Sequence, residues 1–134
     1  MSQKNSILIV EDDHDFKNVL LDFFKTHNDE LIVKAADGVR DSLLTLEGFI
    51  PDVVLLDLKL GKESGFDLLK FLRQGERFKH TKVIVVTGDS DPTNTTVSLE
   101  LGAEEVFLKP LSIKDLLVNI GCNKTLVLKR FFVH

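Results

Sequence analysis

Short, continuous apolar runs alternate along this chain with segments in which apolar residues recur every three or four positions. Runs rich in Val and Ile are typical of strands buried on both faces, whereas the longer period indicates amphipathic helices. The pattern predicts strands at residues 7–10, 31–33, 53–56, 83–86 and 106–108, of which the second is the weakest. It predicts helices at residues 13–25, 39–46, 66–72, 91–101 and 113–120.

The strict alternation of strand and helix predicts an α/β fold. Such an order implies parallel strands joined by right-handed helical crossovers, which place helices on both faces of the sheet. With 134 residues the chain has the length of one domain. We expect this domain to span residues 1–121, and residues 122–134 to form a C-terminal tail or an extension of the last helix.

Four of the predicted strands end in side chains suited to phosphate chemistry. The first strand ends at Glu11 and Asp12, the third at Asp57, the fourth at Thr87 and the fifth at Lys109. The carboxyl ends of parallel strands meet at one edge of a sheet, which is where sites form in open α/β folds. The sequence therefore predicts that three acids, a hydroxyl and an ammonium group converge at this edge.

This set of groups contains every part of a minimal phosphoryl-transfer site. Clustered carboxylates repel one another unless a cation lies among them, and their oxygens suit Mg²⁺. One carboxylate could then attack a phosphoryl donor, while Lys109 and Thr87 bind phosphoryl oxygens. Taken alone, the acidic run from Glu11 to Asp13 could equally cap the following helix, so only the joint placement favours a site.

Composition narrows the class of protein further. The net charge is −4 and no basic stripe is present, which argues against broad binding to nucleic acid or to anionic membranes. The single cysteine, Cys122, excludes an intramolecular disulfide and suits a reducing compartment. The chain starts without a signal-like apolar region, and no apolar run has the length of a membrane span. We therefore expect a cytoplasmic protein.

The motifs at the strand ends resemble those of one known family. They are Glu11-Asp12-Asp13 after a buried strand, Asp57 followed by a loop ending in Ser64-Gly65, Thr87-Gly88, Gly102-Ala103 and Lys109-Pro110. In this combination the chain resembles the receiver domain of two-component response regulators from residue 7 to about residue 120. The resemblance implies a doubly wound, flavodoxin-like sheet of five parallel strands in the order 2-1-3-4-5.

The resemblance also implies a role for each site residue. Asp57 would be the phosphoacceptor, Asp12 the direct ligand of Mg²⁺, and Glu11 a ligand acting through water. The backbone carbonyl of Lys59 would complete the metal site. Thr87 and Lys109 would bind the phosphoryl group, and the peptide bond before Pro110 would be cis.

Two positions depart from the family pattern, and two others should tune the chemistry of the site. Many receivers carry an aromatic switch residue where this chain has Val106, and the neighbouring Phe107 should face the other side of a regular strand. Gly61 stands where proline is frequent, which should loosen the loop after Asp57. Lys59 and Asp89 should flank the path of attacking water, where an ion pair between them would tune the lifetime of the phosphorylated state.

These motifs favour a phosphoacceptor receiver that takes its phosphoryl group from a histidine kinase or a histidine phosphotransfer protein. It would catalyse its own phosphorylation and dephosphorylation, and we expect no independent enzyme activity. Its output would be a downstream protein or a missing output domain. The apolar tail residues Val127, Leu128, Phe131 and Phe132 suggest contact with such a domain or with a second copy in a homodimer.

The sequence leaves two alternative functions to be weighed. Because Val106 replaces the usual aromatic residue, the chain could be a degenerate receiver that acts only as a protein-interaction module. A metal-dependent phosphohydrolase on a similar sheet is disfavoured, because the first strand is followed by neither a Gly-rich phosphate loop nor an Asp-x-Asp pair.

Overall fold

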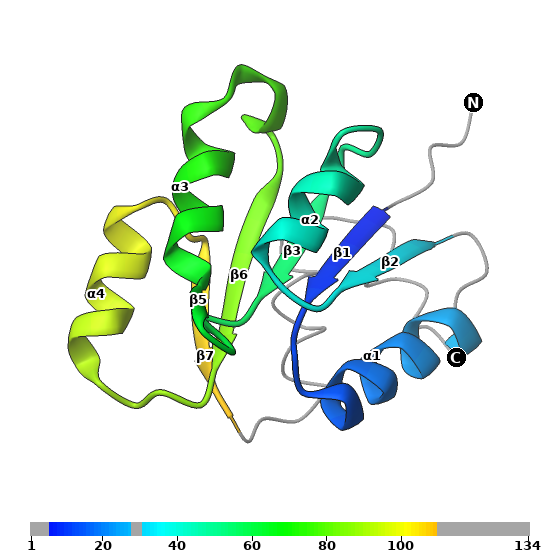
Figure 1. Ribbon diagram of the computed structural model, residues 1–134, viewed down its shortest axis with the longest axis horizontal. Coiled ribbons are helices and arrows are strands. Elements are labelled where there is room, and N and C mark those ends of the chain that lie inside the picture. Colours follow the sequence, from blue (N-terminus) through cyan, green and yellow to red (C-terminus); the bar gives the residue numbers. More distant parts are fainter. Residues whose placement is uncertain (1–5, 28–30, 110–134) are drawn as a thin grey trace.

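A five-stranded parallel sheet forms the centre of the molecule (Figure 1). The structure, a computed structural model, describes residues 6–27 and 31–109. The strands of this sheet are β1 (Ser6–Val10), β2 (Ile32–Ala36), β3 (Val53–Leu56), β6 (Lys82–Thr87) and β7 (Glu105–Leu108). Their order is β2-β1-β3-β6-β7, which confirms the predicted order 2-1-3-4-5.

Helices connect these strands, as the alternating pattern predicts. They are α1 (His14–His27), α2 (Val39–Leu46), α3 (Gly65–Gln74) and α4 (Pro92–Glu100), with a short 3₁₀ helix, η1 (Glu76–Phe78), after α3. The first four predicted helices are thus confirmed to within one or two residues at each end. The predicted helix at 113–120, the cis bond before Pro110 and the tail at 122–134 lie outside the described residues.

The two faces of the sheet bury different side chains of the same strands. In β1, Ile7 and Ile9 pack with Leu20 and Phe24 of α1, whereas Leu8 and Val10 face the opposite side. On that side the apolar faces of α2 and α3 complete the core; its residues from these helices are Leu46, Leu68, Leu69 and Leu72. Figure 1 shows α1 on one side of the sheet and α3 and α4 on the other. The predicted doubly wound arrangement is therefore confirmed.

The segment after Asp57 is more ordered than the sequence pattern indicates. The pattern predicts an irregular loop, but the chain forms a small antiparallel hairpin from β4 (Lys59–Leu60) and β5 (Glu63–Ser64). Leu60 is buried in the core and holds the hairpin against the domain. Gly61 adopts a φ of 63°, a left-handed conformation that glycine tolerates and that allows the tight turn.

Side-chain caps determine where three helices begin. The Asp13 carboxylate accepts hydrogen bonds from the backbone N–H groups of Asp15 and Phe16 at the start of α1. Ser64 caps α3 as predicted, and Asp91 caps α4 ahead of Pro92. Because Asp13 serves α1, the carboxylate of Asp12 remains available at the sheet edge. Within residues 6–27 and 31–109, no helix is long and apolar enough to cross a membrane.

Candidate functional site

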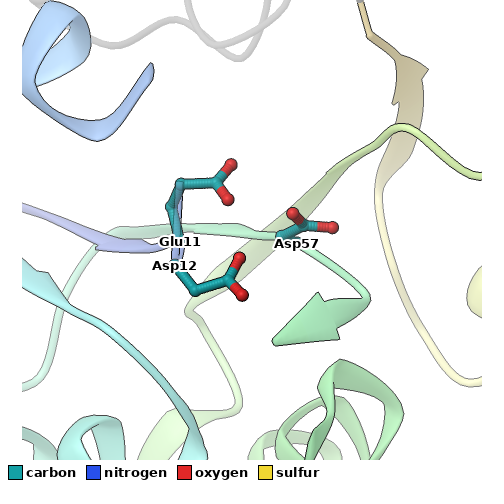
Figure 2. A group of neighbouring side chains, drawn as sticks. All are labelled: Glu11, Asp12 and Asp57. Atoms are coloured by element: carbon teal, nitrogen blue, oxygen red, sulfur yellow. The ribbon is translucent and has the colours of Figure 1, made fainter. Parts of the chain in front are cut away.

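Three carboxylates meet at the carboxyl edge of the sheet (Figure 2). Glu11 and Asp12 follow β1, and Asp57 follows β3, the strand beside it. The backbone N–H of Asp57 donates to the carbonyl of Val10 at 3.0 Å, so the pairing of the strands continues into the site. One carboxylate oxygen from each residue lies within 4.8 Å of the other two. The convergence predicted from the strand ends is therefore present.

The three acids differ in their access to solvent. Glu11 is 2% exposed and Asp57 is 7% exposed, whereas Asp12 is exposed to solvent. A cluster of hard oxygen donors with one open side fits Mg²⁺, which binds one or two carboxylates and keeps several of its waters. The chemistry of this donor set therefore fits a magnesium ion.

Lys109, directly after β7, contacts both buried acids, Glu11 and Asp57. Its ammonium group donates to Glu11 Oε1 at 2.6 Å and to Asp57 Oδ2 at 3.1 Å. The same nitrogen lies 4.8 Å from the centre of the Phe16 ring, a cation–π contact from α1. The backbone N–H of Lys109 donates to the carbonyl of Thr87 at 2.8 Å, which fixes the strand end that carries the side chain.

Burial and close contact shift the pKa values of Glu11 and Lys109. Burial raises the pKa of Glu11 from 4.5 to about 7, against the lowering effect of its hydrogen bond with Lys109. Burial also opposes the charge on Lys109, but its hydrogen bonds and charge interactions with Glu11 and Asp57 outweigh this and raise the lysine pKa. Lys109 is therefore charged at neutral pH, while Glu11 is poised to exchange a proton.

Asp57 lies in an open cleft of about 610 Å³ above this cluster. The backbone N–H of Lys59 donates to Asp57 Oδ1 at 3.1 Å and orients the carboxylate. Thr87 is buried at the end of β6, and its hydroxyl oxygen accepts a hydrogen bond from the backbone N–H of Asp89 at 3.2 Å. The cleft is lined by Asp12, Asp57, Lys59, Gly61, Thr87, Gly88, Asp89, Ser90 and Lys109.

Comparison with known proteins identifies the domain. A family model described as the response regulator receiver domain matches residues 7–121. The chain belongs to the response regulator receiver family. As a receiver domain it is a phosphoacceptor module of two-component signalling, and receivers bind Mg²⁺ at an acidic site of this kind.

Individual receivers show the same relationship. The Regulator of RpoS from Escherichia coli K12 is 37% identical over 110 residues, which are 82% of this chain and 31% of that protein. The transcriptional regulatory protein CpxR from the same strain is 34% identical over 116 residues, or 87% of this chain and 47% of that protein. This chain thus spans less than half the length of these relatives.

A solved structure confirms the fold of the receiver. The signal receiver domain of the DNA binding response regulator protein merR from Colwellia psychrerythraea 34H superimposes with a TM-score of 0.83. It is 32% identical, and the alignment covers 89% of this chain and 97% of that one.

Lys59 and Asp89 do not form the ion pair that the sequence predicts. Lys59 and Asp89 both line the cleft, but no ion pair joins these two described residues. Asp89 instead accepts hydrogen bonds from the Asn94 side chain at 2.6 Å and from the backbone N–H of Asp91 at 3.0 Å. The predicted contact fails because Asp89 is already engaged by the start of α4.

Val106 and Phe107 face opposite sides of β7, as strand geometry requires. Val106 packs with the core on the side of α2 and α3, and Phe107 packs with the core on the side of α1. The receiver therefore has no aromatic ring at the expected switch position on β7.

Sequence reasoning missed the role of Phe16. Its place in the apolar stripe of α1 indicates a core residue, and the ring does pack against the core. Its second contact, with the ammonium group of Lys109, joins opposite ends of the domain sequence. No local pattern could have indicated this contact, because it depends on how β7 and α1 are placed in three dimensions.

Proposed function

We propose that Asp57 accepts a phosphoryl group from a histidine kinase or a histidine phosphotransfer protein. The observation that carries this proposal is the way its carboxylate is held where it lines the open cleft. One oxygen is held by the Lys59 backbone N–H and the other by Lys109, while Asp12 lies beside it on the solvent side. Of the three acids, Asp57 alone both contacts the ammonium group of Lys109 and lines the cleft.

We further propose that Mg²⁺ is held by Asp12, Asp57 and the backbone carbonyl of Lys59, with Glu11 contributing through a water molecule. The ion would supply neutralisation of the charge that develops on the phosphoryl oxygens. The proximity of three carboxylates supports this assignment, because their mutual repulsion favours a cation among them.

The chain's own residues account for the transfer. A carboxylate oxygen of Asp57 attacks the phosphorus of a phosphohistidine and forms an acyl phosphate. The phosphorus–nitrogen bond breaks, and its electron pair returns to the imidazole ring. Lys109 pairs with one phosphoryl oxygen in place of its contact with the free carboxylate, and the Thr87 hydroxyl donates to another. Hydrolysis reverses the modification when water attacks the phosphorus.

Uptake of phosphate from acetyl phosphate tests the assignment of Asp57. The wild-type chain should acquire one acid-labile phosphate in the presence of Mg²⁺, detected by intact mass spectrometry. Asp57→Asn should acquire none while its far-UV circular dichroism stays unchanged. The matched control is Asp67→Asn, an exposed acid in the first turn of α3, which should be phosphorylated like the wild type.

The same experiment distinguishes the other functions. Phosphate retained on Asp57→Asn would overturn the assignment. Continuous turnover of phosphate esters would favour a phosphohydrolase. A chain that takes up no phosphate from acetyl phosphate and forms no adduct with beryllofluoride would be an interaction module only.

Receiver domains interact with histidine kinases and downstream effectors. Since this chain spans less than half the length of its curated relatives, we propose that its output is a separate protein or a domain beyond these residues. We also propose that it acts in the cytoplasm, where a kinase would meet it. Transfer of phosphate from a phosphorylated histidine kinase to the wild type but not to Asp57→Asn would identify the phosphodonor.

A further inference from the structure

The start of α2 is capped by a residue from the hairpin beside the cleft. The backbone N–H of Val39, the first residue of α2, donates to Glu63 Oε1 at 2.9 Å. The residue before it, Gly38, occupies the N-cap position and has no side chain to accept such a bond. Glu63, from β5, therefore satisfies a helix N–H group that the local sequence leaves open.

Gly38 makes room for this contact. An added Cβ at Gly38 would lie 2.3 Å from Glu63 Oε1, which is too close for two non-bonded atoms. The φ angle of Gly38 is −167°, an extended conformation that alanine adopts without strain. A methyl group here would thus displace the Glu63 carboxylate without changing the charge of the chain or straining the backbone.

The hairpin that carries Glu63 forms one wall of the phosphoacceptor cleft. At one end, the backbone N–H of Lys59 orients the Asp57 carboxylate. At its tip, Gly61 faces Asp12, since a Cβ built there would lie 4.0 Å from Asp12 Oδ2. A turn built on glycine loses more conformational freedom on ordering than any other, so an external anchor reduces the cost of holding it in place.

We propose that Glu63 is a positioning residue for the metal site. It anchors the β4–β5 hairpin to α2 and thereby holds the Lys59 carbonyl in place beside Asp12 and Asp57. This inference rests on the proposed binding of Mg²⁺ at the cleft and names a residue that raises its affinity through geometry. By reciprocity, bound Mg²⁺ should strengthen the contact between Glu63 and Val39.

Calorimetric titration of Mg²⁺ into the 134-residue chain measures the effect. Glu63→Ala should weaken Mg²⁺ binding about threefold to tenfold, the range expected when part of a capping hydrogen bond is lost. Gly38→Ala should weaken it similarly, because it displaces the same carboxylate. The double variant should bind no more weakly than either single variant, since both remove one interaction.

Two further variants separate anchoring from simple charge. Glu63→Gln keeps an oxygen that can accept from Val39 and should bind Mg²⁺ within about twofold of the wild type. Lys62→Ala, an exposed change in the same turn, removes a positive charge but no anchor and should not weaken binding. A loss in Glu63→Gln as large as in Glu63→Ala would attribute the effect to charge and overturn the anchoring role.

Hydrogen exchange gives a readout that does not depend on calorimetry. The Val39 amide should exchange more slowly in the wild type when Mg²⁺ is added, and this protection should be lost in Gly38→Ala. If the wild type binds no Mg²⁺ by calorimetry, the proposed metal site itself fails. If it binds Mg²⁺ but Glu63→Ala and Gly38→Ala bind equally well, the site stands and the role of Glu63 is refuted.

Discussion

At the scale of single residues, one buried acid, Glu11, shares the ammonium group of Lys109 with Asp57, the proposed phosphoacceptor. Glu11 is almost fully buried, and its partner Lys109 also contacts Asp57. Burial raises the Glu11 pKa from 4.5 to about 7, so below about pH 7 the metal-free site holds a proton at this position. Any cation that binds the cluster has to compete with that proton.

The raised pKa of Glu11 predicts an unusual pH dependence of stability. Below pH 4.5 the residue is protonated in both the folded and the unfolded chain. Between pH 4.5 and about 7 the unfolded chain loses this proton while the folded chain keeps it, so the contribution of Glu11 to the free energy of unfolding falls as pH rises. In Glu11→Gln this fall should be absent.

Urea unfolding at several pH values with EDTA present, followed by circular dichroism, measures this contribution. The exposed residue Glu100 supplies the control, since Glu100→Gln should keep the wild-type pH profile. Parallel profiles for Glu11→Gln and the wild type would show that Glu11 is not the titrating group.

At the scale of elements, α4 is the helix most directly joined to the cleft. Asp89 lines the cleft, and its carboxylate accepts a hydrogen bond from Asn94 in the first turn of α4. Its backbone N–H donates to the Thr87 hydroxyl oxygen. A movement of Thr87 toward a phosphoryl group would therefore act on Asp89 and, through it, on the start of α4. We expect this route to take the place of the aromatic ring that β7 lacks at Val106.

Asn94→Ala should loosen this connection without unfolding the domain. Alanine favours the helix more than asparagine does, which offsets the lost hydrogen bond, so global stability should change by less than about 1 kcal/mol. Amide exchange at Asp91 should become several-fold faster, because Asp89 is no longer held from α4. Exchange measured by NMR tests this, with exposed Thr93→Ala as the control. Unchanged exchange at Asp91 would show that Asn94 does not hold the loop.

At the scale of the whole molecule, the fold brings together like charges whose repulsion opposes folding. The sheet brings Glu11, Asp12 and Asp57 to one edge, and Lys109 alone among the described residues forms ion pairs with this cluster. A ligand that binds only the folded chain adds to its stability by mass action. Magnesium binding and folding should therefore be coupled through these acids.

Asp12→Ala should raise the stability of the metal-free chain and lower its affinity for Mg²⁺. Removing one of three neighbouring carboxylates relieves repulsion, so the melting temperature without metal should rise by a few degrees. The affinity for Mg²⁺ should fall at least about tenfold, and added Mg²⁺ should no longer raise the melting temperature. Differential scanning calorimetry with and without Mg²⁺ measures both effects. An unchanged affinity would refute the role of Asp12 as a ligand.

Much of this architecture could be predicted because local sequence patterns determine it. Continuous apolar runs indicate strands buried on both faces, and the residues that end them, such as Asp57 and Thr87, must lie at one edge once the strands are parallel. The caps Ser64 and Asp91 are likewise local, since their side chains bond to N–H groups two residues along the chain. The sequence by itself therefore determined the class of fold, the edge that carries the site and the residues that meet there.

Only the tertiary structure decided which partner each of those side chains has. The contact of Phe16 with Lys109, the bond between Glu63 and Val39 and the engagement of Asp89 by Asn94 all follow from how separate elements approach one another. The hairpin after Asp57 is also decided this way, because burial of Leu60 draws a segment without strand periodicity onto the core. Local periodicity specifies which face a side chain occupies, whereas its partner depends on distances and directions that only the packed fold defines.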